Sequence, residues 1–172
     1  MIRVRDADAA DAATVRDIHR AAFGQDDEAD LVAALLRDET AQPVLSLLAE
    51  TDEGAVGHIL FSAARVAGRR AALLAPLAVR PECQRKGIGG ALIAEGLARL
   101  RGTGVAAVFV FGDPAYYGRS GFAPAHAHGM APPHPVEEPW RDAWQAVVFA
   151  PYTVSGRVSV ARSLDDPVLW QV

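Results

Sequence analysis

Residues 84–93 read Gln-Arg-Lys-Gly-Ile-Gly-Gly-Ala-Leu-Ile, and they follow an apolar run that ends at Val79. This order predicts a buried strand, a basic glycine-rich loop and then an amphipathic helix. Glycine has no Cβ, so an anion can approach the backbone, and the first N–H groups of a helix have no partner within the helix. Those donors and the helix dipole favour a phosphate, and Arg85 and Lys86 add positive charge. The stretch therefore predicts a pyrophosphate-binding loop within an α/β fold.

The spacing of the glycines separates this loop from two common nucleotide-binding motifs. A P-loop needs two glycines five positions apart, followed by Lys and then Ser or Thr, and residues 84–93 hold no such arrangement. A dinucleotide fingerprint needs a third glycine at the position where this chain has Leu92. A helix that simply begins at a glycine turn is the alternative that the loop alone leaves open.

The loop resembles the acyl-CoA loop of the GNAT N-acetyltransferase superfamily, whose Gln/Arg-x-x-Gly-x-Gly/Ala pattern is met by residues 84–89. A second block follows an apolar strand, since residues 112–122 read Gly-Asp-Pro-Ala-Tyr-Tyr-Gly-Arg-Ser-Gly-Phe. This block is similar to the Tyr-x-x-x-Gly-Phe block of the family. Its residues most resemble the corresponding residues in a branch of small single-domain bacterial acetyltransferases. The specific motifs cover only residues 77–92 and 113–122.

The apolar periodicity alternates between helix and strand, which predicts one α/β domain of mixed (α+β) type over residues 1–172. The expected elements begin with an edge strand at 2–5 and two helices that end near 38 and lie on one side of the sheet. An antiparallel meander follows at 44–49, 56–66 and 71–79. A helix then runs from the glycine loop to about 101, a strand at 105–111 lies parallel to the strand before that helix, and late strands follow at 143–150 and 157–161. Pro76 would delete a ladder hydrogen bond from a central strand, a conflict that disappears if the sheet splays there. The resemblance implies a GNAT fold, in which a mostly antiparallel sheet flanked by helices splays between its fourth and fifth strands to admit the pantetheine arm.

Composition narrows the functional class. The chain has 172 residues, of which 51% are hydrophobic, and this proportion is typical of a compact domain with a sizeable core. A net charge of −4 without a basic stripe argues against a nucleic-acid partner, and no apolar run of about 18 residues predicts a membrane span, so we expect a cytoplasmic protein. The single cysteine, Cys83, excludes an internal disulfide and a thiolate metal cluster. At a helix start it is either an inert small residue or a site of mixed-disulfide formation with CoA.

The resemblance implies that acetyl-CoA is the cosubstrate and that no metal is required. The expected cofactor-binding residues come from the strand end, the loop and the second block: Leu77, Ala78, Val79, Gln84, Arg85, Lys86, Gly87, Ile88, Gly89, Gly90, Asp113, Tyr116, Tyr117 and Arg119. The backbone N–H of Val79 is the implied donor to the oxyanion that develops on the thioester oxygen. Asp113 is also a good N-cap for the short helix that follows it.

Tyr117 is the implied general acid, which would protonate the departing CoA sulfur. A thiol with a pKa near 8.5 is a tolerable leaving group without help, so we expect the acid to contribute about 10²-fold. The alternative is that Tyr116 and Tyr117 both serve only as packing aromatics.

The sequence departs from the family pattern at the position where a general base is expected. Many GNAT enzymes carry a glutamate on the strand before the glycine loop, yet residues 70–79 contain no carboxylate. An alkylamine has a pKa around 10 and arrives protonated, so a proton acceptor is needed. The candidates are Glu28, Asp30, His58, Glu137 and Glu138, and we favour Glu28 or His58 as catalytic. Each has an ordinary structural alternative as a solvated charge or a hydrogen-bonded core residue.

The late histidines give a second possible site. His126 and His128 alternate and, with His134, would suit zinc if they lay on a strand, although the surrounding glycine and prolines favour a loop. We expect this loop to border the acceptor pocket, with Trp140 and Trp144 as apolar walls.

The sequence thus supports two functions. The first is an N-acetyltransferase that moves an acetyl group from acetyl-CoA to a primary amine of a small molecule or peptide, by direct attack in a ternary complex. The second is a non-catalytic acyl-CoA sensor or partner-binding module, which the missing strand carboxylate favours. Aminoglycosides, polyamines, peptide N-termini and amino acids all remain open as acceptors, and a late apolar strand would allow a homodimer.

Overall fold

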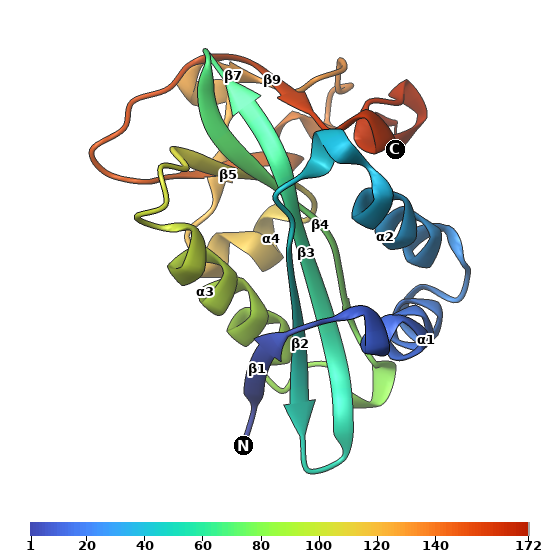
Figure 1. The fold of residues 1–172 in the computed structure, drawn as a ribbon. Helices are drawn as coiled ribbons and strands as arrows, with labels where there is room; N and C mark the ends of the chain where they lie inside the picture. The colour runs from blue at the N-terminus through green and yellow to red at the C-terminus, as the bar shows by residue number, and fades with distance from the viewer. Residues whose placement is uncertain (172) are drawn as a thin grey trace.

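The computed structural model describes residues 1–171, which alternate between strands and helices (Figure 1). In chain order the elements are β1 (Arg3–Asp6), α1 (Ala12–Phe23), α2 (Asp27–Arg37), β2 (Leu45–Thr51), β3 (Gly54–Val66), β4 (Arg69–Val79), α3 (Ile88–Leu100), β5 (Ala107–Phe111), α4 (Pro114–Tyr117), β6 (Ala123–Pro124), β7 (Met130–Ala131), β8 (Trp144–Val148) and β9 (Gly156–Val160). Within this described part, no helix has both the length and the apolar character needed to cross a membrane. The predicted α/β fold with mixed strand directions is confirmed.

The main sheet has the strand order β1-β2-β3-β4-β5-β8-β6. Consecutive hairpins join β2, β3 and β4 into the predicted antiparallel meander, while β4 and β5 run parallel because α3 connects them. The far end of β3 pairs with β9, so the C-terminal part of the chain returns to the hairpin of β3 and β4. The sheet is therefore mixed and mostly antiparallel, as expected.

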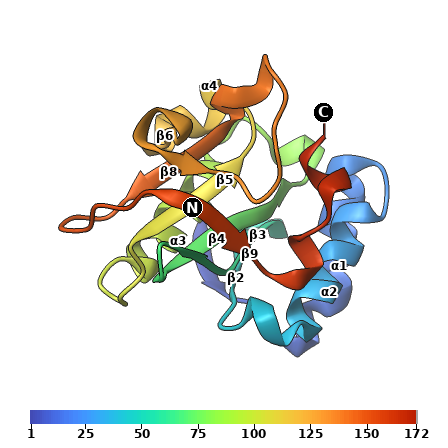
Figure 2. The same cartoon turned by 90° about the horizontal axis from the view of Figure 1, so that it is seen from above.

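The helices form two layers, one on each face of the sheet (Figures 1 and 2). Val15 and Ile18 of α1 and Val32 and Leu35 of α2 belong to one buried cluster with Leu60 on β3. The inner residues of α3 belong to the other cluster, together with Ile59 and Phe61 of β3: they are Ile88, Leu92, Ile93 and Leu97. Because side chains alternate along a strand, each face of β3 serves a different helical layer.

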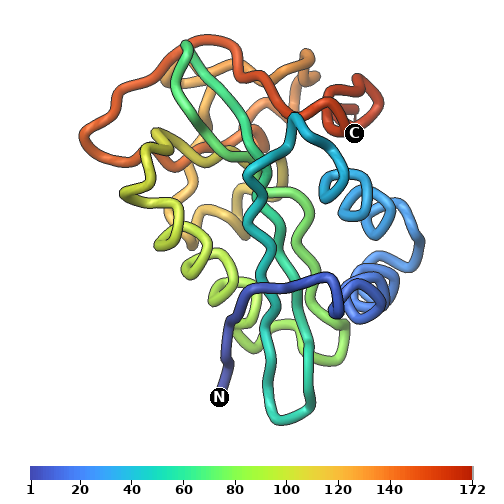
Figure 3. The backbone as a smooth tube through the Cα atoms, in the orientation of Figure 1, coloured from blue at the N-terminus to red at the C-terminus, as the bar shows by residue number. Residues whose placement is uncertain are grey.

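The sheet opens between β4 and β5, and the path of the backbone through both strands can be followed by residue colour in Figure 3. Their parallel ladder holds only two pairs, Ala72 with Val108 and Leu73 with Phe109, although β4 continues to Val79. On the other side of β4 the register with β3 shifts at Pro76, which has no Cα partner there. Pro76 therefore takes part in neither ladder, so the absence of its N–H removes no ladder hydrogen bond and a proline is compatible with this central strand.

In the late region one expectation is confirmed and one needs correction. Residues 126–128 form a 3₁₀ turn, in agreement with the loop that the surrounding glycine and prolines predict, so His126 and His128 lack the strand spacing of the zinc alternative. Trp144 does not form the wall of a pocket, because it is 1% exposed, its ring stacks on Phe109 with centroids 5.1 Å apart, and its indole N–H donates to the carbonyl of Met130. Its place at the start of β8, facing the core, explains the burial.

Candidate functional site

The glycine loop ends where α3 begins, and its backbone prepares an anion site. Gly87, the N-cap, has φ of 82°, a left-handed conformation that favours glycine, and Arg85 has φ of 62°. The first backbone bond of the helix runs from the N–H of Ala91 to the carbonyl of Gly87 (3.0 Å). The N–H groups of residues 88–90 precede that bond and are available to a ligand at the positive end of the dipole.

The end of β4 offers further backbone donors toward the gap in the sheet. The N–H of Arg80 donates to the carbonyl of Val56 on β3 (2.8 Å). Backbone groups of alternate residues in an antiparallel strand face the same neighbour, so those of Val79 and Leu77 point away from β3, toward the opening. The carboxamide of Gln84 donates to the carbonyl of Val79 (3.0 Å) and leaves the N–H as the free group at that position.

A cavity of about 1340 Å³ joins this strand end to the loop, to the outer face of α3 and to the second block. Its lining residues are Leu77, Val79, Cys83, Gln84, Arg85, Gly87, Ile88, Gly89, Gly90, Ala94, Leu97, Ala98, Arg101, Asp113, Ala115, Tyr116, Tyr117, Arg119 and Ser120. Three arginines stand against one aspartate in this lining, although the whole chain carries a net charge of −4. The cavity is therefore built for an anionic ligand of considerable length, and we call it the donor cavity.

Two glycines hold the tyrosines of the second block in place. A Cβ at Gly89 would overlap the hydroxyl of Tyr116, and a Cβ at Gly112 would overlap the ring of Tyr117. Asp113 caps α4, because its carboxylate accepts from the N–H of Ala115 (2.9 Å). The tyrosines are thus positioned by close backbone contact as well as by helix geometry.

Tyr117 has the environment of a proton donor. Its ring packs edge-on against Tyr116 and Phe122, with centroids 5.0 and 5.8 Å away. Burial, with a smaller contribution from Tyr116, raises the pKa of Tyr117 above its ordinary value. Burial also raises the pKa of Tyr116, although the Arg119 guanidinium, 5.2 Å above its ring, partly opposes this. At neutral pH the Tyr117 phenol therefore keeps its proton.

The donor cavity gathers every expected cofactor-binding residue except two, Ala78 and Lys86. Ala78 is buried in the opposite cluster with α1, because neighbouring side chains on a strand face opposite ways. Lys86 is exposed and does not line the cavity. Cys83 does line it, but burial and the nearby Glu53 raise the pKa of the thiol, which favours the inert alternative.

The sequence reasoning missed the outer face of α3. Ala94 and Ala98 of the helix and its C-cap Arg101 line the donor cavity, and they continue along one side from the expected Gly90 at helical spacing. The guanidinium of Arg101 lies 4.5 Å from the ring centre of Phe149. The recurrence of small residues every four positions was a readable signal, because it predicts a helix face on which a ligand can lie close to the backbone.

The two favoured base candidates lie outside the donor cavity. Glu28 is in the first turn of α2, where the carboxamide of Gln25 donates to its carboxylate (3.2 Å). His58 is fully buried on β3, with one ring nitrogen near Ser46 and the other near His19. Neither side chain is in position to contact a ligand in that cavity.

Comparison with known proteins agrees with this geometry. The model of the acetyltransferase (GNAT) family matches residues 12–122. The chain belongs to the GNAT family of acetyltransferases. The uncharacterized N-acetyltransferase YjhQ of Escherichia coli is 45% identical to this GNAT chain over 161 residues, which are 90% of the chain and 89% of YjhQ.

Two solved structures extend the comparison to the fold of this GNAT chain. The crystal structure of the GNAT family N-acetyltransferase YhbS from Escherichia coli, in complex with CoA, gives a TM-score of 0.84 at 32% identity, over 96% of this chain and 92% of that one. A GNAT acetyltransferase from Brucella melitensis in complex with acetyl-CoA gives a TM-score of 0.76 at 33% identity, over 96% and 99%. The splayed sheet is the GNAT fold.

The late histidines have ordinary surface partners. Nε2 of His126 lies 2.6 Å from the Asp142 carboxylate, and Nε2 of His134 lies 2.7 Å from that of Asp165. Over residues 1–171, no three His, Cys, Asp or Glu side chains are grouped in a way that would hold a metal ion.

Proposed function

We propose that this GNAT chain transfers the acetyl group of acetyl-CoA to a primary amine of a small molecule or peptide, by direct attack within a ternary complex. The observation that carries the proposal is the donor cavity, which joins the glycine loop, the free backbone of Val79 and the Tyr117 phenol in one continuous space. Relatives solved with CoA and acetyl-CoA support the choice of donor.

The roles divide by position within the donor cavity. The N–H groups of residues 88–90 and the Arg85 side chain would hold the pyrophosphate at the start of α3. The gap beside β4 would receive the pantetheine arm, which places the thioester near Val79. Polar groups fixed before the substrate arrives cost no reorganisation during reaction, which is how such sites lower a barrier.

The N–H of Val79 would stabilise the oxyanion that forms when the amine attacks the thioester carbon. That group points toward the gap and the β3 ladder does not use it. Tyr117 would then donate its proton to the departing sulfur, which suits its raised pKa.

The test has two measurements on the intact protein. Calorimetry with acetyl-CoA measures binding, and release of the CoA thiol in the presence of an amine panel (an aminoglycoside, a polyamine, free amino acids and short peptides) measures transfer. We expect binding and transfer to at least one amine, with the product mass raised by one acetyl group. Accumulation of an acetylated enzyme before product would contradict direct attack.

The second candidate, an acyl-CoA sensor, is favoured by one observation. Neither Glu28 nor His58 lines the donor cavity, so no favoured base lies beside the thioester there. Binding of acetyl-CoA without transfer to any amine would support the sensor, and absence of binding would exclude both functions.

A further inference from the structure

The outer edge of β3 is interrupted between its two neighbours on that side. β3 pairs with β2 as far as Phe61 and with β9 from Ala64 onward. A cavity of about 490 Å³ lies over this interruption, bordered by the start of β2, the second half of β3, the start of β4, the end of α3 and β9. It shares no lining residue with the donor cavity. We call it the hairpin cavity.

The hairpin cavity is remote from the proposed reaction centre. The turn that joins β3 to β4 lies at one end of the molecule, and the loop before α3 lies toward the other end (Figure 1). Arg70 lines the hairpin cavity near the start of β4, whereas Val79 ends that strand. At the rise of an extended strand, up to about 30 Å separates the two residues. A ligand in the hairpin cavity therefore would not contact a thioester beside Val79.

Two arginines are the only charged side chains that line the hairpin cavity within residues 1–171. Arg65 on β3 and Arg70 on β4 are direct cross-strand partners, so their side chains leave the same face of the sheet. Like charges placed opposite each other on neighbouring strands repel and destabilise the pair. An anion between the two guanidinium groups would remove that repulsion.

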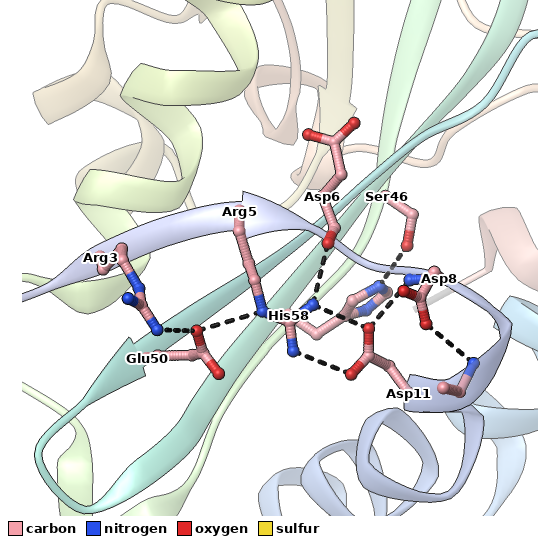
Figure 4. A network of polar contacts seen from close by, with 9 residues as sticks. Arg3, Arg5, Asp6, Asp8, Asp11, Ser46, Glu50 and His58 are labelled. Carbon is pink, nitrogen blue, oxygen red and sulfur yellow. Dashed lines mark hydrogen bonds and ion pairs between the residues drawn. The ribbon is translucent and has the colours of Figure 1, made fainter.

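The arginines of the hairpin cavity differ from those of β1. Arg5 on β1 binds the carboxylates of Glu50 and Asp11, at 3.1 and 2.9 Å (Figure 4). Arg65 and Arg70 have no ion pair in the part of the chain that the structure describes. Their positive charge is therefore available to a ligand.

Backbone carbonyls orient both guanidinium groups and leave most of their donors free. Nη1 of Arg70 donates to the carbonyl of Thr103, which also lines the cavity (2.8 Å), and Nη1 of Arg65 donates to the carbonyl of Gly68 (3.4 Å). A guanidinium carries five N–H donors, so most of them remain available. Its fork matches the two oxygens of a carboxylate or phosphate.

Much of the remaining lining is apolar. Phe61 is 1% exposed, and it borders the cavity together with Leu100 at the end of α3 and Val105 before β5. The Phe61 ring packs closely on α3, since a Cβ at Gly96 would overlap it. The cavity therefore has a fixed apolar wall beside its two positive charges.

The interruption of the edge adds polar backbone to the cavity. Ser62 and Ala63 pair only with β4 and line the cavity. Because backbone groups alternate between the two edges of a strand, the N–H and carbonyl of one of these residues face the interruption without a strand partner. Strands usually have three or more residues, so an interruption this short does not accommodate another strand. The opening suits a small molecule.

We propose that the hairpin cavity binds a small organic acid. Its carboxylate or phosphate would lie between Arg65 and Arg70, and its apolar part would contact Phe61 and Leu100. The volume of about 490 Å³ is in the range of small-molecule sites. Within residues 1–171, no Cys, His, Lys, Asp or Glu side chain lines the cavity, so the ligand is bound without being converted. This inference does not depend on the proposed acetyl transfer.

Amide NMR of the intact protein with excess CoA tests the site. The probes are phenylacetate, phenyl phosphate and the neutral phenylacetamide. We expect both acids to shift the amide signals of Ala63 and Thr103, the more tightly bound acid showing which acidic group the site prefers. Equal shifts with phenylacetamide, or shifts confined to residues 87–90 of the donor cavity, would overturn the proposal. Inorganic phosphate that binds as tightly as phenyl phosphate would also overturn it, because the apolar wall would then contribute nothing.

The variants R65Q and R69Q form a matched pair for the same titration. Both residues are exposed and each variant removes one positive charge, but Arg69 does not line the cavity and lies 5.3 Å from the ring centre of Tyr152. We expect R65Q to raise the Kd of the preferred acid about 10- to 100-fold, as for loss of a hydrogen bond to a charged group. R69Q should leave that Kd unchanged. Equal Kd values in the two variants would overturn the proposal.

Discussion

The two faces of the sheet differ in how they are built. On the α3 face, the donor cavity consists of backbone donors, glycines and arginines that stay close to solvent. On the α1 face, a chain of neutral imidazoles lies inside an apolar cluster and is fully covered. The first face suits an anionic ligand, and the second is a closed interior in which two histidines are held neutral. The difference teaches that one sheet can carry a binding surface on one face and a packed core on the other, because β3 and β4 present alternate side chains to each.

The largest expected effect concerns the α1 face, and it is the pH dependence of the free energy of unfolding. Unfolded histidines take up protons below a pKa of about 6.5, whereas folded His19 and His58 stay neutral down to about 4 and about 3. The unfolded state binds more protons in this window, so the free energy of unfolding should fall as pH falls from about 6.5 to 4, by about 1.4 kcal/mol per pH unit for each histidine. Urea unfolding at several pH values measures the slope.

The matched variants for that slope are H58F and H128A. Removal of the buried His58 should reduce the slope by about half, because His19 still contributes, while removal of the exposed His128 should leave it unchanged. A slope in H58F equal to that of the wild type would show that the fold does not hold His58 neutral at low pH.

The next effect tests the α3 face. Tyr117→Phe removes the phenol proton but keeps the ring packing against Phe122. We expect kcat to fall about 10²-fold, which corresponds to about 2.7 kcal/mol, with the Kd of acetyl-CoA unchanged. Steady-state kinetics and calorimetry together separate the two quantities, and an unchanged kcat would remove Tyr117 from the mechanism.

A smaller effect comes from the backbone that positions this tyrosine. Gly112→Ala places a Cβ against the Tyr117 ring, whereas Gly118→Ala, just after α4, meets no atom within 4 Å. We expect Gly112→Ala to lower kcat about tenfold and the free energy of unfolding by about 1–3 kcal/mol, as for overpacking. Gly118→Ala should match the wild type in both. Identical behaviour of the two variants would mean that close backbone contact does not hold Tyr117.

The smallest effect concerns the cap of α4. Asp113→Ala removes the carboxylate that accepts from the N–H of Ala115, and should cost about 1 kcal/mol of stability. Asp113→Asn keeps an acceptor oxygen and should retain most of that stability. Thermal melts of the two variants provide the measurement, and equal losses would point to charge rather than capping as the contribution of Asp113.

Most of the lining of the donor cavity could be predicted from the sequence, except the outer face of α3, whereas the histidine contacts on the α1 face could not. The glycine loop, Asp113 and Tyr117 are positioned by local geometry, since glycine spacing and helix capping are fixed within a few residues. The bond between His58 and His19 joins residues 39 positions apart, and the one between His58 and Ser46 joins residues 12 apart. Neither periodicity nor composition encodes such contacts.

The wrong expectation for Trp144 has a similar physical origin. Trp144 was expected at a pocket wall, but its register in β8 turns it toward Phe109 in the core. Lys86 stays a predicted contact of the cofactor, because it is exposed and adjacent to lining residues Arg85 and Gly87 although it does not line the cavity itself. The direction of a side chain depends on register and local dihedral angles, which residue identity alone does not determine.

The hydrogen bond from Gln84 to the carbonyl of Val79 has a consequence for the integrity of the sheet. A gap between two strands is an internal edge, and an edge with free donors and acceptors is a template for pairing with a foreign strand. The carboxamide of Gln84 already bonds to the acceptor at Val79, so this residue presents to the gap an N–H and a carbonyl with one of its two lone pairs in use. An added strand would need both groups, whereas an oxygen atom needs only the N–H, so the Gln84 contact disfavours strand addition at this residue more than it disfavours ligand binding.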